Sequence, residues 1–185
     1  MAITGRGILL ALLAVDDNKK GISGITRFQK LLYLITKEDA AKNITKAIFD
    51  FVPYKMGPYS SKLYDDLEMM ENLGLLESSP VSNPTAEELA EGSLNFDDLM
   101  GEDSDTSDST DSAEEKQYRL TEKGISYAKE VLTNPDYAPV LDSIRKVKSR
   151  FSNYSLQDLL YYVYTKYPED TTESMIKDQV FRKGK

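Results

Sequence analysis

The side chains that most often do chemistry at neutral pH are missing from this sequence. Its 185 residues include no cysteine and no histidine. These absences exclude disulfide bonds, thiolate metal ligands, cysteine nucleophiles and a histidine general base. An enzyme of this composition would have to use carboxylates, lysine or tyrosine alone. We therefore expect a protein that is not an enzyme and that uses no cofactor or metal.

Three closely spaced acids, Asp65, Asp66 and Glu68, come nearest to a catalytic or metal-binding group. Paired carboxylates can act as general acid and base or can ligate a cation. However, adjacent residues on a helix diverge by about 100°, so Asp65 and Asp66 would not converge on one ion. We interpret these acids as a solvated helix face.

Two groups of residues are candidates for contact with a macromolecular partner. The first surrounds a turn before an expected helix and consists of Tyr54, Lys55, Tyr59, Ser60, Ser61 and Lys62. The second is a basic cluster at helical-neighbour spacing and consists of Arg145, Lys146, Lys148 and Arg150. For the basic cluster three interpretations stay open: a solvated helix face, a phosphate contact, or a docking site for the chain's own acidic segment.

A helix over residues 61–72 is predicted to position the first group. Met56-Gly57-Pro58 has the composition of a turn, Ser60 or Ser61 is expected to cap the helix, and Gly74 is placed to end it. The buried face has steps of four and three residues and consists of Leu63, Leu67 and Met70. The side expected to face solvent consists of Lys62, Asp65, Asp66, Glu68 and Asn72.

Apolar periodicity elsewhere predicts a mainly helical chain. Further helices are expected over residues 8–15, 26–36, 122–132, 140–151, 155–164 and 172–180. The expected N-caps of three of them are Thr26, Thr121 and Ser155. Residues 37–46 are interpreted as a surface helix or turn, and residues 47–52 fit either a strand or a helix end. Leu75-Leu76 is expected to pair with residues 118–120 as a β-hairpin.

The net charge of −8 is concentrated in one segment. Val81 to Glu115 contains twelve acidic residues and no basic one, so the rest of the chain is mildly basic. Residues 78–115 are also rich in Ser, Thr and Pro and poor in large apolar residues. Such a segment buries too little surface to offset its ordering entropy, so we expect it to be disordered.

Three motifs together resemble small prokaryotic winged-helix proteins of the SocA-like or Panacea antitoxin type and the related YwgA-like group. The motifs are RFQKLLYLI at 27–35, PYKMGPYSSKLYDDLEMMENLGLL at 53–76 and YRLTEKG at 118–124. The resemblance implies a winged-helix core and a non-enzymatic role. Its members are either DNA-binding regulators or antitoxin-type proteins that bind a toxin or deliver a partner to a protease. The long acidic insert departs from the compact family pattern.

We therefore expect a mainly α fold with a small β-hairpin (α+β). Residues 1–77 and 116–133 form the expected winged-helix core, 78–115 form an acidic, disordered wing insert, and 134–185 form a C-terminal helical extension. The expected function is protein–protein interaction of an antitoxin or adaptor kind. The alternative is a DNA-binding transcriptional regulator, which the carboxylates on the central helix disfavour.

Two further expectations concern assembly and location. A cluster of tyrosines near the C-terminus makes a homodimer a possible state, because tyrosine gives large contact area with a polar tip. The apolar run Ile8–Val15 is too short to span a bilayer and lacks a clear cleavage site. We therefore expect a cytoplasmic protein that does not contact membranes.

Overall fold

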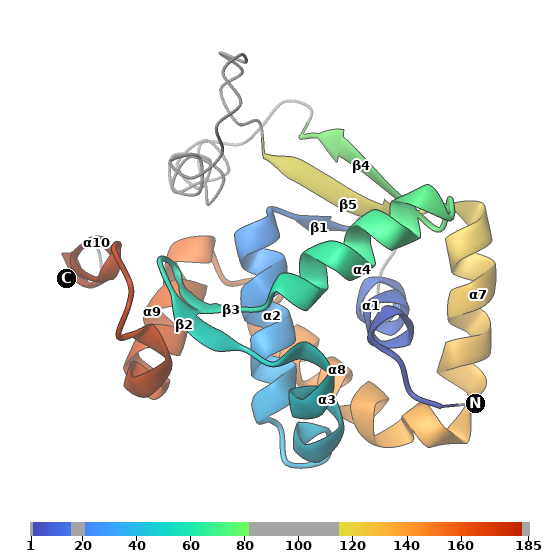
Figure 1. Ribbon diagram of the computed structural model, residues 1–185, viewed down its shortest axis with the longest axis horizontal. Coiled ribbons are helices and arrows are strands. Elements are labelled where there is room, and N and C mark those ends of the chain that lie inside the picture. The colour runs from blue at the N-terminus through green and yellow to red at the C-terminus, as the bar shows by residue number, and fades with distance from the viewer. Residues whose placement is uncertain (1, 16–20, 82–114, 183–185) are drawn as a thin grey trace.

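The computed structural model describes residues 2–15, 21–81 and 115–182, and it is mainly helical with a small antiparallel sheet (Figure 1). The α-helices are α1 Gly5–Ala14, α2 Ile25–Lys37, α3 Lys42–Phe49, α4 Ser61–Asn72, α7 Glu122–Thr133, α8 Ala138–Phe151, α9 Leu156–Lys166 and α10 Lys177–Arg182. Short 3₁₀ helices are η2 Pro135–Tyr137 and η3 Pro168–Thr171. The strands are β1 Ile22–Ser23, β2 Val52–Tyr54, β3 Gly57–Tyr59, β4 Leu76–Pro80 and β5 Lys116–Leu120.

The first helix is buried almost all round. Its apolar run lies between α7, α4, α8 and α3. It begins at Gly5 rather than at Ile8, because the Thr4 side chain accepts a hydrogen bond from the Gly7 amide and caps the helix. A helix with no solvated face needs no amphipathic period, which agrees with the continuous apolar sequence.

Helix α2 stands at the centre of the molecule and contacts α3, α8, α9 and β3 (Figure 1). The prediction that Thr26 caps this helix is wrong. Thr26 is buried inside the first turn, and the helix is preceded by Gly24, whose φ of 81° turns the chain out of β1. The Gly24 amide donates to the Lys116 carbonyl, so this turn is fixed by the sheet instead of by a side-chain cap.

The segment after α2 differs from the expectations in two ways. Its helix begins at Lys42, later than the interpreted surface stretch, and runs to Phe49 before Asp50 ends it with a φ of 41°. The second difference is that Gly57 and Pro58, which were expected in a turn, belong to strand β3. The turn is Lys55-Met56, at the tip of a two-stranded hairpin in which Val52 pairs with Tyr59 and Tyr54 with Gly57. Gly57 has a φ of 82°, and a Cβ there would lie 3.0 Å from the Tyr164 ring, so both backbone and packing require glycine.

The expected hairpin of Leu75-Leu76 with residues 118–120 is confirmed and is longer than predicted. Strands β4 and β5 pair antiparallel from Leu76 with Leu120 to Pro80 with Lys116. A third strand, β1, pairs with the other side of β5, which gives the order β1-β5-β4. The expected disorder of residues 78–115 is wrong at both ends of the segment, because residues 78–80 belong to strand β4 and the Val81 amide donates to the Glu115 carbonyl. Residues 82–114 lie outside the described residues.

The C-terminal helices confirm most of the predicted boundaries. Thr121 and Ser155 cap α7 and α9 with side-chain hydrogen bonds, as expected. The last helix begins at Lys177 and not at Thr172, because the chain first forms η3 after Pro168. Helices α8 and α9 both pack on α2, so the N-terminal and C-terminal parts share one hydrophobic core.

Two glycines give a matched test of the junction between α4, β4 and α7. After α4, the Gly74 amide donates to Glu71 and the Leu75 amide donates to Met70, which is the expected glycine-ended helix terminus. Gly74 has a φ of 66° and open space around it, whereas a Cβ on Gly124 would lie 1.9 Å from the Leu75 carbonyl oxygen.

We predict that Gly74→Ala costs about 1–2 kcal/mol of unfolding free energy through backbone strain alone. Gly124→Ala should cost more, about 3 kcal/mol, because α7 has to move away from the Leu75 carbonyl. Urea unfolding of both variants measures the two costs. A larger loss of unfolding free energy for Gly74→Ala than for Gly124→Ala would show that Gly124 does not lie close to the Leu75 carbonyl in solution.

Candidate partner-binding site

The start of α4 is held by two neighbouring side chains of α2. Gln29 is 3 % exposed; its Nε2 donates to the Ser60 carbonyl at 3.0 Å, and its Oε1 accepts from the Ser60 amide at 3.1 Å. Lys30 is 2 % exposed, and its Nζ donates to the Pro58 carbonyl at 2.9 Å. The buried polar backbone between β3 and α4 is therefore satisfied by side chains from α2. We call these contacts the α2 latch.

The prediction that the hydroxyl of Ser60 or Ser61 caps α4 is wrong for both residues, and Ser61 is the first residue of the helix. Ser60 occupies the N-cap position, but its side chain makes no capping bond and donates instead to the Phe49 carbonyl at the end of α3. Ser60 is only 1 % exposed. It therefore positions α3 against α4 and cannot touch a partner directly.

Of the first predicted group, the other members lie around the β2–β3 hairpin and the first turn of α4. Tyr54 and Tyr59 stack with ring centroids 5.1 Å apart, and Tyr59 lies 5.8 Å from Tyr64, so three half-buried rings form a row. Burial is the main cause that raises the pKa of Tyr59. Lys55 is half-buried, and its carbonyl accepts from the Met175 amide at 2.8 Å. Ser61 and Lys62 are exposed.

Asp66 corrects the predicted solvent-facing side of α4. It is 2 % exposed, and its Oδ1 pairs with Lys62 Nζ at 2.6 Å and lies 3.7 Å from Arg6 Nη1. Its other oxygen lies close to Gly5 at the beginning of α1. That oxygen is buried and accepts no hydrogen bond from the described residues, and the partial positive charge of the helix N-terminus offsets part of the cost of burying it. Lys62 is consequently engaged with an internal acid.

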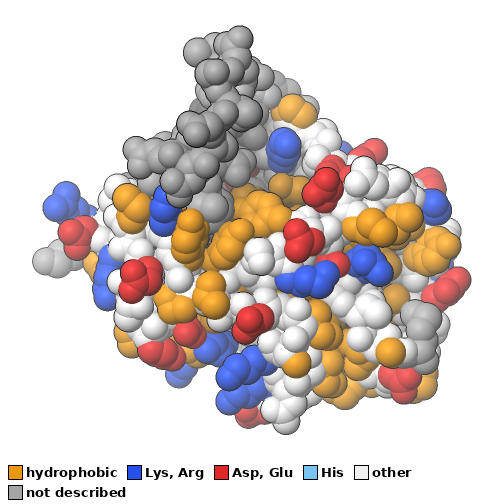
Figure 2. Space-filling model, viewed as in Figure 1, with side chains coloured by type: hydrophobic (Ala, Val, Ile, Leu, Met, Phe, Trp, Pro, Cys, Tyr) orange, Lys and Arg blue, Asp and Glu red, His pale blue; other side chains and the backbone are white. Residues whose placement is uncertain are grey.

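The outward face of α4 is both acidic and apolar. We define it by its exposed residues Asp65, Glu68, Met69, Asn72 and Leu73. Met69 is 44 % exposed and Leu73 is 43 % exposed, although both are large apolar side chains. The ammonium of Lys123 donates to the Leu73 carbonyl at 2.8 Å, which places α7 beside this face. Figure 2 shows hydrophobic side chains gathered where the end of α4 meets α7.

The four side chains of the predicted basic cluster have separate contacts. Lys148 Nζ donates to the Leu12 carbonyl at 3.0 Å and also to the Val15 carbonyl, so it satisfies the C-terminal carbonyls of α1. The other three side chains are exposed, and each interacts within its own surroundings. Arg145 pairs with Asp142, Lys146 lies 3.9 Å from Glu38, and Arg150 lies over the Phe151 and Tyr162 rings.

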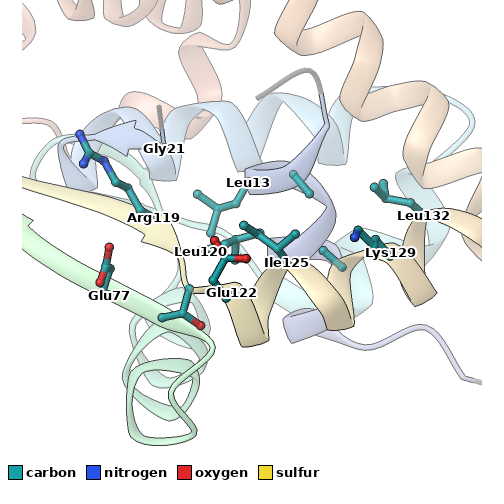
Figure 3. A pocket seen from close by; sticks show the side chains of 12 residues that line it. Leu13, Gly21, Glu77, Arg119, Leu120, Glu122, Ile125, Lys129 and Leu132 are labelled. Atoms are coloured by element: carbon teal, nitrogen blue, oxygen red, sulfur yellow. The ribbon is translucent and has the colours of Figure 1, made fainter. Parts of the chain in front are cut away.

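Sequence patterns did not indicate a groove that lies between α1, the β4–β5 hairpin and α7 (Figure 3). It encloses about 610 Å³, and its apolar wall is formed by Leu13, Leu120, Ile125, Ala128 and Leu132. Charged side chains around it are Glu77, Arg119, Glu122 and Lys129. This lining suits an apolar ligand group. Sequence patterns could not reveal the groove, because its walls come from separate elements, and the periodicity within one element does not show how the elements pack together.

The described residues contain no group of three or more acidic side chains placed to hold a metal ion. Within the same ranges, no helix has both the length and the apolar character needed to cross a bilayer. A scan against protein-family models and a search of curated proteins each find no match to this chain.

The α2 latch makes stability depend on pH through Lys30. Burial lowers the pKa of Lys30 from its ordinary 10.5 to about 7. Between these two values the unfolded chain holds a proton on Lys30 that the folded chain has lost. The unfolding free energy should therefore rise with pH over this window, by at most about 1.4 kcal/mol per unit.

We predict that Lys30→Met removes this rise. Urea unfolding at pH 7.5 and 9 should show wild-type stability increasing relative to the variant, whereas Lys166→Met, at an exposed site, should follow the wild type. A difference between wild type and Lys30→Met that does not change with pH would mean that Lys30 is charged and solvated in the folded protein.

Proposed function

We propose that this chain is a non-enzymatic protein with a winged-helix core that acts by binding a protein partner, in the manner of an antitoxin or adaptor. Three features support the core assignment. Helix α1, strand β1, helix α2, helix α4 and the β4–β5 hairpin have the chain order of a winged helix, with α3 and the β2–β3 hairpin inserted between α2 and α4. Strand β4 lies at the edge of the sheet β1-β5-β4 and packs against α4, so the hairpin lies where a wing would lie. The three sequence motifs that resemble the antitoxin-type group fall on these elements.

The outward face of α4 is the observation that carries the proposal. Lys62 is the one basic residue of this helix, against Asp65, Asp66, Glu68 and Glu71. Lys62 is exposed but pairs with Asp66, so the one basic side chain of this helix is already engaged with a carboxylate and the exposed acids of the helix would repel phosphates. Binding to nucleic acid depends on neutralisation of phosphates by basic side chains. The face is therefore unfavourable for the major groove.

The same face has the composition of a protein interface. Met69 and Leu73 are one helical turn apart and form a continuous apolar stripe. Tyr127 is 49 % exposed and follows Lys123 by one turn of α7, on the side of the Leu73 contact. Methionine and tyrosine are enriched in interface cores, and exposed clusters of large apolar side chains mark contact sites.

DNA binding remains the second candidate, on one specific observation. Tyr54, Lys55 and Tyr59 lie together at the hairpin, and a lysine flanked by aromatic rings can contact a phosphate backbone. This function would use the hairpin and the start of α4 instead of the outward face.

Affinity purification of the tagged protein from its native host tests the first proposal. We predict that one stoichiometric partner is recovered and that Met69→Ser/Leu73→Ser lowers its recovery at least tenfold, measured by quantitative mass spectrometry. Met175→Ser, which removes a 62 % exposed methionine on the C-terminal segment, is the matched control and should leave recovery unchanged.

Equal recovery with the double variant would contradict a partner site on α4. A gel shift with genomic fragments tests the second candidate. It is run at about 50 mM salt, because DNA binding strengthens at low salt and is then easiest to detect. A shift that Lys55→Gln weakens and Met69→Ser/Leu73→Ser does not would establish the DNA-binding alternative.

A further inference from the structure

A small cavity opens between the end of α2, helix α3, the start of the β2–β3 hairpin and η3. It encloses about 190 Å³, and its lining residues are Tyr33, Thr36, Lys37, Lys42, Lys46, Asp50, Phe51 and Asp170. Figure 2 shows Lys and Arg side chains gathered at the lower edge of the molecule, over the end of α2 and α3. The cavity is remote from the outward face of α4 and shares no residue with it.

Three lysines converge on this cavity. Lys42 and Lys46 are one turn apart on α3, and Lys37 comes from the last turn of α2. In the part of the chain that the structure describes, neither Lys42 nor Lys46 forms an ion pair. Two positive charges at this spacing on one helix repel each other, so binding of an anion between the two ammonium groups would be favourable.

The acids that face the cavity offset this charge only in part. Asp170 is already engaged: its Oδ2 accepts from Lys37 Nζ at 2.7 Å and from the Tyr33 hydroxyl at 2.5 Å. Burial acts to raise the pKa of Asp170, but the hydrogen bonds from Lys37 and Tyr33, together with the positive charges of Lys37 and Lys46, outweigh it and hold the pKa below its usual range. Asp50 is the second acid, at the left-handed end of α3. Three lysines against two carboxylates leave an excess positive charge.

The remaining wall is aromatic and rigid. The Tyr33 and Phe51 rings meet edge to face with centroids 5.4 Å apart, and Tyr33 is 1 % exposed. Lys37 Nζ lies 4.8 Å from the Tyr33 ring centroid and 5.0 Å from that of Tyr167, so its position is fixed by ring contacts as well as by Asp170. A ligand therefore meets one preorganised cation and two adaptable ones beside an apolar surface.

We propose that this cavity binds the phosphate group of a small phosphorylated ligand. A phosphate with a few attached atoms fits about 190 Å³, whereas a larger ligand would have to extend into solvent. Lysine is a common phosphate ligand because its ammonium acts as a compact point charge. The Phe51 ring is placed to contact the organic part of the ligand.

The test measures binding of inorganic phosphate and of phosphoserine by heteronuclear NMR titration and thermal unfolding, at constant ionic strength made up with chloride. Both ligands should shift the amide signals of α3 and raise the unfolding temperature. Lys42→Gln/Lys46→Gln should weaken both affinities at least tenfold, while the exposed pair Lys166→Gln/Lys177→Gln should leave them unchanged.

A second variant separates binding from a structural role of the lysines. Asn adopts the left-handed conformation of residue 50 as readily as Asp does, so Asp50→Asn should preserve the fold and increase phosphate affinity severalfold. Equal affinities for the wild type and for both variants would overturn the proposal. Binding of single-stranded oligonucleotides without binding of phosphate or phosphoserine would overturn it in favour of a nucleic-acid surface.

Discussion

The α2 latch is the interaction on which the rest of this fold depends. Between β3 and α4 the chain passes through the interior with backbone groups that neither strand nor helix can satisfy. Leaving such groups unpaired would cost several times the net value of a hydrogen bond. Gln29 satisfies the amide and carbonyl of Ser60, and Lys30 satisfies the carbonyl of Pro58. The Gln-Lys pair of one sequence motif and the Gly-Pro-Tyr-Ser segment of another therefore form the two sides of one contact.

Several lysines form contacts within the protein and are therefore not available to bind a partner. Lys148 caps α1, Lys62 neutralises the buried carboxylate of Asp66, and Lys37 binds Asp170. The sequence alone suggests that each of these lysines could contact a partner, but in the structure each one binds a group of the protein itself. What α4 offers to a partner is consequently acid and apolar surface, which is why the proposed function favours protein over nucleic acid. Lys42 and Lys46 are different, because neither forms an ion pair with another described residue, although the charge of Lys46 acts on Asp170. This difference supports the phosphate proposal.

Most local features were predictable from the sequence, although the Thr26 cap was not. Of the long-range contacts, the pairing of β4 with β5 was predicted and the side-chain contacts were not. Thr121, Ser155 and Gly74 act within a few residues of themselves, so their capping and terminating roles were predicted correctly. Ser60 and Asp66 fit the same local patterns, but Phe49 and Arg6, which are distant in sequence, changed their roles. At the site, sequence patterns located the hairpin tyrosines and the helix start. The exposed Met69–Leu73 stripe, the groove beside α7 and the lysine cavity arise only when separate elements meet.

Native-state hydrogen exchange at the Ser60 amide tests the central claim most directly. If Gln29 Oε1 is its acceptor, this amide should exchange as slowly as the core amides of α2. In Gln29→Leu, which cannot accept a hydrogen bond, the amide should exchange at least a hundredfold faster than the change in global stability explains, because the start of α4 then opens locally. Rapid exchange of the Ser60 amide in the wild type, or slow exchange that Gln29→Leu leaves unchanged, would show that α4 is not held by α2.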